Sequence, residues 1–394
     1  MKTTLFIIGV IWLFLWEILR VYFIMPFPGS QQMNSVHWAY WIGRNILWLR
    51  LIGLVLVCYP IVYFFIQKQL LPKILAAVLG IAYIVVFYLF NYQYEADKMF
   101  YQPKHQLFAN SADDSTNTRQ LVIGVVINQE AKAYPLQMIG YHHQIVDTIG
   151  NTPVIITYCT VCRTGRVYSS FVNGKNESFR LVGMDHFNAM FEDATTKSWW
   201  GQATGEAIAG ALQGHKLKEL PSNQLTLAAW LRQYPNSFIL QPDPSFKKQY
   251  ADLNGYDKGT VKSSLEKRDS GSWHPKSWVV GVVQNGTAKA YDWNTFVHQQ
   301  IINDTCNNQP VVLVLEEDTA SFHVFNRILN GHVFHFQKNV NNTFMDSITH
   351  SVWNMDGECI EGSEKGSKLQ PVQAYQEFWH SWKTFHPGTG RYEE

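Results

Sequence analysis

The stretch Leu121-Val-Ile-Gly-Val-Val-Ile-Asn-Gln-Glu-Ala-Lys-Ala-Tyr134 recurs later in the chain as Trp278-Val-Val-Gly-Val-Val-Gln-Asn-Gly-Thr-Ala-Lys-Ala-Tyr291. The two copies are shifted by 278 − 121 = 157 residues. Such a period is far longer than that of a solenoid, whose repeats span tens of residues. The repetition therefore predicts two related lobes rather than an array of short repeats.

A second pair of blocks extends the duplication. Gly205-Glu-Ala-Ile-Ala-Gly210 recurs as Gly357-Glu-Cys-Ile-Glu-Gly362, at a shift of 357 − 205 = 152 residues. Turn-forming pairs such as Asn173-Gly174 separate short β-prone runs, and such pairs are typical of β-hairpins. Each lobe is therefore predicted to be mostly β, closed by a short helix at 225–234 in lobe one and 375–385 in lobe two.

The rest of the chain is divided around these two lobes. The predicted fold class is an N-terminal region of three transmembrane helices plus a mostly-β (α+β) ectodomain made of two duplicated lobes. The predicted parts are the three helices at 1–92, a polar connector at 93–120, lobe one at 121–241, an inter-lobe insert at 242–277 and lobe two at 278–394.

The first part holds three apolar segments, at about 5–25, 46–66 and 74–90. Each is near the ~20 residues that a helix needs to cross a bilayer. The first is interrupted only by Glu17 and Arg20, which are spaced to pair on one helix face. We predict three membrane spans, with the lipid bilayer as a partner.

Lysines in the short loops predict the orientation of these spans. Lys2 precedes the first span, and Lys68 and Lys73 lie between the second and the third. Because positive loops face the cytoplasm, the bulk of the chain is predicted to be extracytoplasmic, in a plasma or inner membrane protein. That compartment is oxidising, so thiols there are open to disulfide formation.

Overall charge gives little further guidance. The 394 residues carry 32 Lys and Arg against 31 Asp and Glu, for a formal net charge of +1. Proteins that bind nucleic acid usually show a basic excess or a basic stripe, and none is visible. We therefore expect no nucleic-acid partner.

One chemically distinctive motif lies in lobe one. Cys159 and Cys162 are separated by two residues, whereas the positions that match them in lobe two are Glu316 and Thr319. Two thiolates at this spacing supply half of a zinc site or the core of a copper site. The remaining ligands would then be histidines of the same lobe: His142 first, then His143 and His186.

Other interpretations of the cysteine pair remain open. Arg163 and Arg166 follow at once, and cations lower a thiol pKa, which suits a thiol–disulfide oxidoreductase that works with a redox partner. A structural disulfide or an inert pair is the plain alternative. Two further cysteines of lobe two, Cys306 and Cys359, would be able to bridge if they lie close enough.

Several short motifs, taken together, resemble a known family. They are, in order, Gly124-Val125 with Ala133-Tyr134-Pro135, His142 ahead of Asp147, Thr157-Tyr158-Cys159 with Cys162, Ser198 with Trp200, and Gly205-Glu206-Ala207-Ile208-Ala209-Gly210. From about Met99 onward the chain resembles a prokaryotic family known only as domain of unknown function 3179. Where that family usually has proline and an acid, this chain has Thr160 and His143. The resemblance implies membership but no agreed activity.

Three functions follow as hypotheses from these patterns. The first is a soft-metal site for copper or zinc at Cys159 and Cys162, helped by histidine and served by a metal-transfer partner. The second is a thiol–disulfide oxidoreductase at the same residues. The third is a non-catalytic module that binds a ligand or partner. The sequence does not decide whether the protein is an enzyme.

Overall fold

The chain is seen in a computed structural model, which describes residues 1–68 and 70–393. The chain forms two compact units. Unit 1 consists of Met1–Tyr101, Glu177–Gly201 and Glu206–Lys216; unit 2 consists of Gln102–Asn176, Gln202–Gly205 and Leu217–Glu394. The stretch predicted as lobe one thus contributes to both units.

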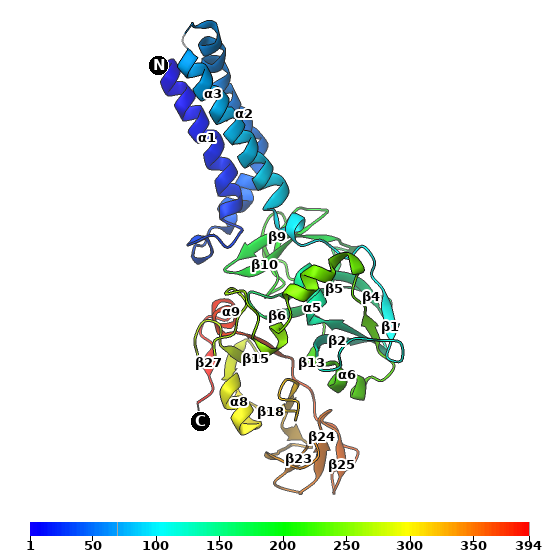
Figure 1. The fold of residues 1–394 in the computed structure, drawn as a ribbon. Coiled ribbons are helices and arrows are strands. Elements are labelled where there is room, and N and C mark those ends of the chain that lie inside the picture. Colours follow the sequence, from blue (N-terminus) through cyan, green and yellow to red (C-terminus); the bar gives the residue numbers. More distant parts are fainter. Residues whose placement is uncertain (69, 394) are drawn as a thin grey trace. The chain divides into compact units, whose positions relative to one another are not determined.

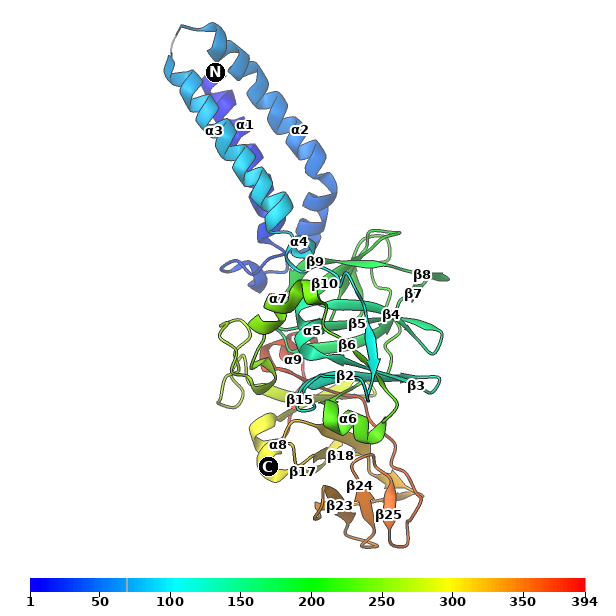
Figure 2. The same cartoon turned by 45° about the vertical axis from the view of Figure 1, so that its right-hand side comes forward.

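Unit 1 contains three long helices, which run side by side in Figures 1 and 2. They are α1 Lys2–Tyr22, α2 Val36–Ile66 and α3 Leu70–Tyr88, the last continued by a π-helical turn at Leu89–Gln93. All three are long and apolar enough to cross a membrane. Two shorter segments are η1 Ser30–Gln32 and α4 Ala96–Met99. The predicted three-helix region is therefore confirmed.

Charged side chains between these helices are satisfied by one another. Glu17 is fully buried and forms an ion pair with Arg50, whose Nε lies 2.5 Å from its Oε1. Arg20 instead reaches Glu95, at 2.6 Å. The predicted pairing of Glu17 with Arg20 on one helix face is wrong, because partners on other segments engage both residues.

Unit 1 also contains a four-stranded antiparallel sheet in the order β12-β11-β10-β9. Its strands are β9 Phe179–Asp185, β10 Asn188–Asp193, β11 Trp199–Gly201 and β12 Ala207–Ala209. The carbonyl of Ile24, just after α1, accepts a hydrogen bond from the Met184 amide at 2.7 Å. This bond joins the sheet to the helical part of the unit.

The lobe-one part of unit 2 is built on a five-stranded sheet in the order β1-β14-β3-β2-β13. These strands are β1 Phe108–Asn110, β2 Leu121–Ile127, β3 Glu130–Pro135, β13 Asn223–Thr226 and β14 Phe238–Leu240. A second sheet and a short hairpin follow from β4 Gln144–Ile149, β5 Thr152–Cys159, β6 Thr164–Ser169, β7 Phe171–Val172 and β8 Lys175–Asn176. The helices are α5 Leu136–His142 and α6 Leu227–Gln233.

Lobe two repeats this plan with a central sheet in the order β26-β15-β16-β27. Its elements are β15 Trp278–Gln284, β16 Thr287–Asp292, α8 Trp293–Gln299, β17 Ile301–Cys306, β18 Gln309–Leu315, β19 Phe322–Asn326, β20 Ile328–Leu329, β21 His332–Val333, β22 Phe336–Lys338, β23 Thr343–Asp346, β24 Val352–Asn354, β25 Cys359–Glu361, β26 Ala374–Phe378, α9 Trp379–Phe385 and β27 Gly390–Arg391. In both lobes the last strand runs parallel to the second strand of the hairpin, β14 to β3 and β27 to β16. The duplication is confirmed element by element.

The predicted Asn-Gly turns and closing helices are also present. β7 and β8 pair across Asn173 and Gly174, which have φ of 48° and 80°, as a type I′ hairpin turn requires. The closing helices α6 and α9 are shorter at their N-terminal ends than predicted, because β13 and β26 occupy those residues. The insert at 242–277 contains η3 Pro244–Phe246, α7 Lys247–Asp252 and η4 Tyr256–Lys258.

The two lobes meet through equivalent residues. Gln224 Nε2 donates to Gln376 Oε1 at 3.0 Å, and these positions correspond under the duplication, since 376 − 224 = 152. The turn after β5 of lobe one contacts lobe two, and the turn after β18 of lobe two contacts lobe one. The Cys162 carbonyl accepts from the Phe378 amide at 3.0 Å, and Ser321 Oγ accepts from the Thr226 amide at 2.9 Å. The lobes are thus joined by a reciprocal exchange of turns.

Candidate functional site

The cysteine pair lies on the lobe-one turn, between β5 and β6. Both Cys159 and Cys162 are completely buried, and neither forms a disulfide within the described residues. Burial raises the pKa of the Cys162 thiol well above its ordinary value, and a hydrogen bond and charge from Cys159 raise it further. The two thiols are therefore in contact, and the raised pKa favours the protonated form of Cys162.

Arg166, the second of the two arginines that follow, is engaged by groups of lobe two. Arg166 forms an ion pair with Glu377 of β26, at 2.5 Å, and its guanidinium lies 3.5 Å from the ring centre of Tyr375. Both charged side chains of the pair are almost fully buried. Against the larger effect of burial, the cation that lowers the pKa of the Cys162 thiol is Lys276.

The three candidate histidines have other contacts. His142 Nε2 lies 2.7 Å from the Tyr250 hydroxyl, and its ring packs edge-on against Phe246. His143 Nδ1 lies 2.9 Å from the Tyr158 carbonyl oxygen, and burial lowers the pKa of this imidazole to about 4. His186, in unit 1, has Nδ1 2.8 Å from Asp185 Oδ1.

No cluster that could hold a metal ion through three or more His, Cys, Asp or Glu side chains occurs in residues 1–68 and 70–393. Near the thiols stands Lys276, whose Nζ donates to the Val161 carbonyl at 2.5 Å. Burial lowers the Lys276 pKa, against the opposing influence of the two cysteines. Cys306 and Cys359 of lobe two are also unbridged and belong to separate core clusters.

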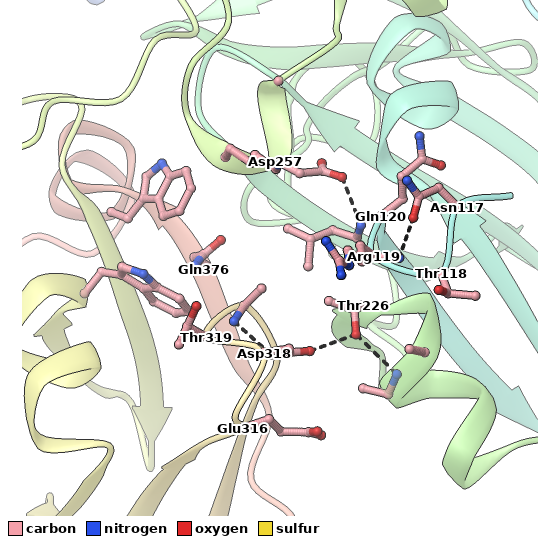
Figure 3. Close-up of a pocket in the computed structure, with 18 of the residues that line it drawn as sticks. Asn117, Thr118, Arg119, Gln120, Thr226, Asp257, Glu316, Asp318, Thr319 and Gln376 are labelled. Carbon is pink, nitrogen blue, oxygen red and sulfur yellow. Dashed lines mark hydrogen bonds between the residues drawn. The ribbon is translucent and has the colours of Figure 1, made fainter.

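A cavity of about 1070 Å³ lies within unit 2, between the lobes. Figure 3 shows that its labelled side chains come from both lobes and the connector: Asn117 to Gln120 from the end of the connector, Thr226 from lobe one, and Glu316, Asp318, Thr319 and Gln376 from lobe two. Asp257 of the insert contributes as well. The residues 316–320 form the lobe-two turn, the counterpart of the cysteine turn. This exchanged turn is therefore one wall of the cavity.

The cysteine turn contributes to the same cavity through Arg163. This residue has a positive φ of 55°, and its side chain is only 1% exposed. Its Nε donates to Gln376 Oε1 at 2.7 Å, its Nη1 donates to the Tyr256 carbonyl at 3.3 Å, and its guanidinium lies 3.9 Å from the ring centre of Trp278. Its Nη2 has no hydrogen-bond partner among the described residues.

A second guanidinium approaches the same indole. Arg268 of the insert lies 4.2 Å from the Trp278 ring centre, and its Nη2 donates to Asn294 Oδ1 at 2.5 Å. Burial lowers the pKa of Arg268, and the charge of Arg163 lowers it further. Within the described part of the chain, Arg268 Nε and Trp278 Nε1 also lack a hydrogen-bond partner.

The acidic side chains of the cavity, in contrast, have partners. Arg232 donates to both oxygens of Glu316 at 2.7 Å, and His323 Nε2 lies 2.8 Å from Oε1 of the same carboxylate. Burial opposes ionisation of Glu316, but His323, Asn342 and Arg232 outweigh it and lower the pKa to about 2.

The other three acids are held in similar ways, and Glu317 accepts a hydrogen bond from the Asn342 amide at 3.0 Å. Asp318 accepts hydrogen bonds from the hydroxyls of Thr226 and Ser321. Asp257 accepts one from the Leu121 amide at 3.0 Å, and burial raises its pKa.

Among the described residues that line this cavity, the buried side-chain atoms without a partner are therefore donors, and two of these three belong to guanidiniums. Oδ1 of Asp292, a carboxyl that acts on Arg268 from outside the lining, also lacks a partner in the described part of the chain.

Sequence reasoning found only part of this set. It singled out Arg163, but as a neighbour of the thiols, whereas the structure places its side chain against Trp278. Trp278 itself opens the second copy of the repeat, where lobe one has Leu121, and this difference was a usable signal. Arg268 lies in the insert, which has no counterpart in the duplication, so no pattern pointed to it.

Comparison with known proteins adds a family but no activity. The family described as "Protein of unknown function (DUF3179)" matches residues 101–389, which include both lobes and the cavity between them. The comparisons with curated proteins and with solved structures gave no match. Because the match spans most of the chain and contains the motifs described above, the chain belongs to this family of proteins of unknown function.

Proposed function

We propose that this protein is a membrane-anchored, extracytoplasmic binding module that holds a small molecule in the cavity between its two lobes. The cavity carries the proposal: at about 1070 Å³ it is large enough for a drug-sized ligand, and it lies at the junction of the two lobes. Three helices long enough to span a membrane supply the anchor, and the lysines of their short loops support an outside location for the lobes.

The arrangement of the cavity walls supports recognition. Three of the lining side chains, Thr226, Asp318 and Glu316, are held by hydrogen bonds across the lobe junction before any ligand arrives. A preformed wall loses little entropy on binding. Because the exchanged turn 316–320 belongs to one lobe and contacts the other, a ligand here would also stabilise the junction.

A bulky side chain in this wall tests the proposal. Ala320 lines the cavity on the exchanged turn, whereas Ala112 is exposed on a connector loop outside it. We expect the full chain, purified in detergent, to release a small molecule on denaturation, as detected by mass spectrometry. Ala320→Trp should lose this molecule while Ala112→Trp retains it. Equal retention by both variants, or no bound compound from a panel of acids, bases and neutral molecules, would contradict the proposal.

A second candidate function concerns the thiol pair, where the contact between Cys159 and Cys162 is the supporting observation. Thiolates select soft metals such as Cu(I), which is satisfied by two sulfurs, whereas zinc would need further ligands. Binding would replace two thiol protons by the ion, and the Lys276 ammonium would offset the remaining negative charge. A metal-transfer protein would then be the partner.

The lobe-two thiols provide a matched control for this candidate. Under reducing conditions the full chain should hold one equivalent of Cu(I) against a chromogenic chelator. The double variant Cys159→Ser, Cys162→Ser should lose it, whereas Cys306→Ser, Cys359→Ser should keep it. Equal copper in both variants would remove the candidate. A Cys159–Cys162 disulfide that forms and breaks with the redox buffer, without copper binding, would favour thiol–disulfide exchange instead.

A further inference from the structure

Three side chains that line one part of the interlobe cavity each carry an unsatisfied hydrogen-bond donor. These donors are Arg163 Nη2, Arg268 Nε and Trp278 Nε1, all buried atoms without a partner in residues 1–68 and 70–393. A buried donor without an acceptor is costly, and a charged one more so. Arg163 and Trp278 are 1% and 5% exposed, so bulk water cannot easily replace the acceptor. A ligand group with several oxygen atoms would offer an acceptor to each of the three donors.

The charges around these donors point to the same kind of group. The guanidinium centres of Arg163 and Arg268 lie 3.9 and 4.2 Å from the centre of one indole ring, so two like charges share a small space. Two like charges this close to one ring repel each other, and an anion beside them would offset the repulsion. Two carboxyls act on these guanidiniums, Asp257 on Arg163 and Asp292 on Arg268, and burial raises the pKa of Asp257, which weakens it as a counter-charge.

We propose that the cavity binds a small organic acid anion, whose oxygens accept hydrogen bonds from Arg163, Arg268 and Trp278. This inference rests on the proposed binding function and specifies its ligand class. Guanidinium groups are well suited to acid oxygens because their donors are planar and permanently charged.

The rest of the cavity indicates that the anion has an organic body. Trp293 and Val297 of α8 line it beside the donors, and its volume of about 1070 Å³ far exceeds that of an inorganic ion. Apolar walls with a few convergent polar groups are typical of sites for small organic ligands. The acid group would meet the guanidiniums while the body lies against the aromatic wall.

The duplication produces one such site rather than two. The position that matches Arg163 in lobe two is Ala320, since 320 − 163 = 157, and the position that matches Trp278 in lobe one is Leu121. Neither of these residues supplies a side-chain donor. The anion site is therefore a specialisation of one side of the junction, and it shares its loop with the cysteine pair.

Matched pairs of acids and amides test the ligand class. We would titrate the full chain in detergent micelles with benzoate, benzamide, succinate and succinamide at constant ionic strength, following binding by calorimetry. The acids should bind, and their uncharged amides should bind at least about tenfold more weakly, because a charge-assisted hydrogen bond is lost. Any small molecule that co-purifies with the chain should likewise carry an ionised acid group.

Arginine variants locate the site. Arg268→Gln, at a half-buried position, and Arg163→Gln should each weaken acid binding about tenfold or more. Arg391→Gln is the control, because Arg391 also stacks on aromatic rings, 4.7 Å from Trp273, but lies outside the cavity. It should leave binding unchanged.

Two results would overturn the proposal, and only the second would also contradict the proposed binding function. If the amides or a neutral co-purified molecule bind as well as the acids, or if Arg268→Gln leaves acid binding intact, the anion assignment fails while the binding function stands. If no compound binds and none is released from the wild-type chain, the binding function fails with it.

Discussion

Replacing Arg166 by methionine is expected to lower the free energy of unfolding by about 3–5 kcal/mol, because the change leaves Glu377 as an unpaired buried charge. The two side chains are 2% and 1% exposed and form the main ionic link between lobe one and β26 of lobe two. Ser381 donates to the other oxygen of Glu377 at 3.1 Å, so the carboxylate is fixed in the core and cannot turn to solvent. Urea unfolding of the full chain in micelles measures the loss.

Two further variants show whether the cost comes from the unpaired charge. The double variant Arg166→Met, Glu377→Met should recover much of the stability, because no charge is then left behind. Lys216→Met breaks an exposed pair with Glu206, 3.4 Å apart, and should cost less than about 1 kcal/mol. A single Arg166→Met variant as stable as wild type would contradict the buried link between the lobes.

Replacing Gly281 by alanine is expected to be the second most damaging change, at about 1–3 kcal/mol or more, because it overpacks a closed core. A Cβ at this position would lie 2.2 Å from Trp382 Cζ3, and Trp382 is completely buried. Lobe one repeats the arrangement, since a Cβ on Gly124 would lie 2.3 Å from Trp230. The thermal midpoint of the full chain reports the effect.

The control and the rescue for this prediction use the same lobe. Gly390 lies on the exposed strand β27, where a Cβ would make only ordinary contacts at 3.8 Å, so Gly390→Ala should leave the midpoint nearly unchanged. In a Trp382→Leu background, Gly281→Ala should lower the midpoint less than it does in the wild-type chain, because the smaller side chain leaves room for the Cβ. Equal midpoints for Gly281→Ala and Gly390→Ala would show that the glycine–tryptophan contact is not needed.

Local patterns predicted much of the fold. The apolar stretches located the three helices, and the repeat of Leu121–Tyr134 at Trp278–Tyr291 located both lobes and their equivalent strands. What the sequence did not reveal depends on long-range packing. Nothing local shows that each lobe's turn contacts the other lobe, or that Glu177–Gly201 belongs with the helices rather than with its own lobe.

The candidate site, too, was predicted from the sequence only where local patterns determine it. The Cys-x-x-Cys motif drew attention to its turn, and the turn does reach the interlobe cavity, but through Arg163 rather than through the thiols. The direction of the Arg163 side chain cannot be read from the local sequence, because it is set by Gln376 and Trp278 of lobe two, which contact the guanidinium. His142 was expected to assist the thiols, whereas its Nε2 lies by the Tyr250 hydroxyl of the insert. Metal and redox chemistry at Cys159 and Cys162 remain predictions.

The most direct test of the binding account is a crystal structure of the full chain grown with the acid that binds most tightly. The account predicts one acid molecule between the lobes, with its oxygens within hydrogen-bond distance of Arg163 Nη2, Arg268 Nε and Trp278 Nε1. A cavity that stays free of the acid, with the acid bound elsewhere or these donors satisfied by the protein itself, would contradict it.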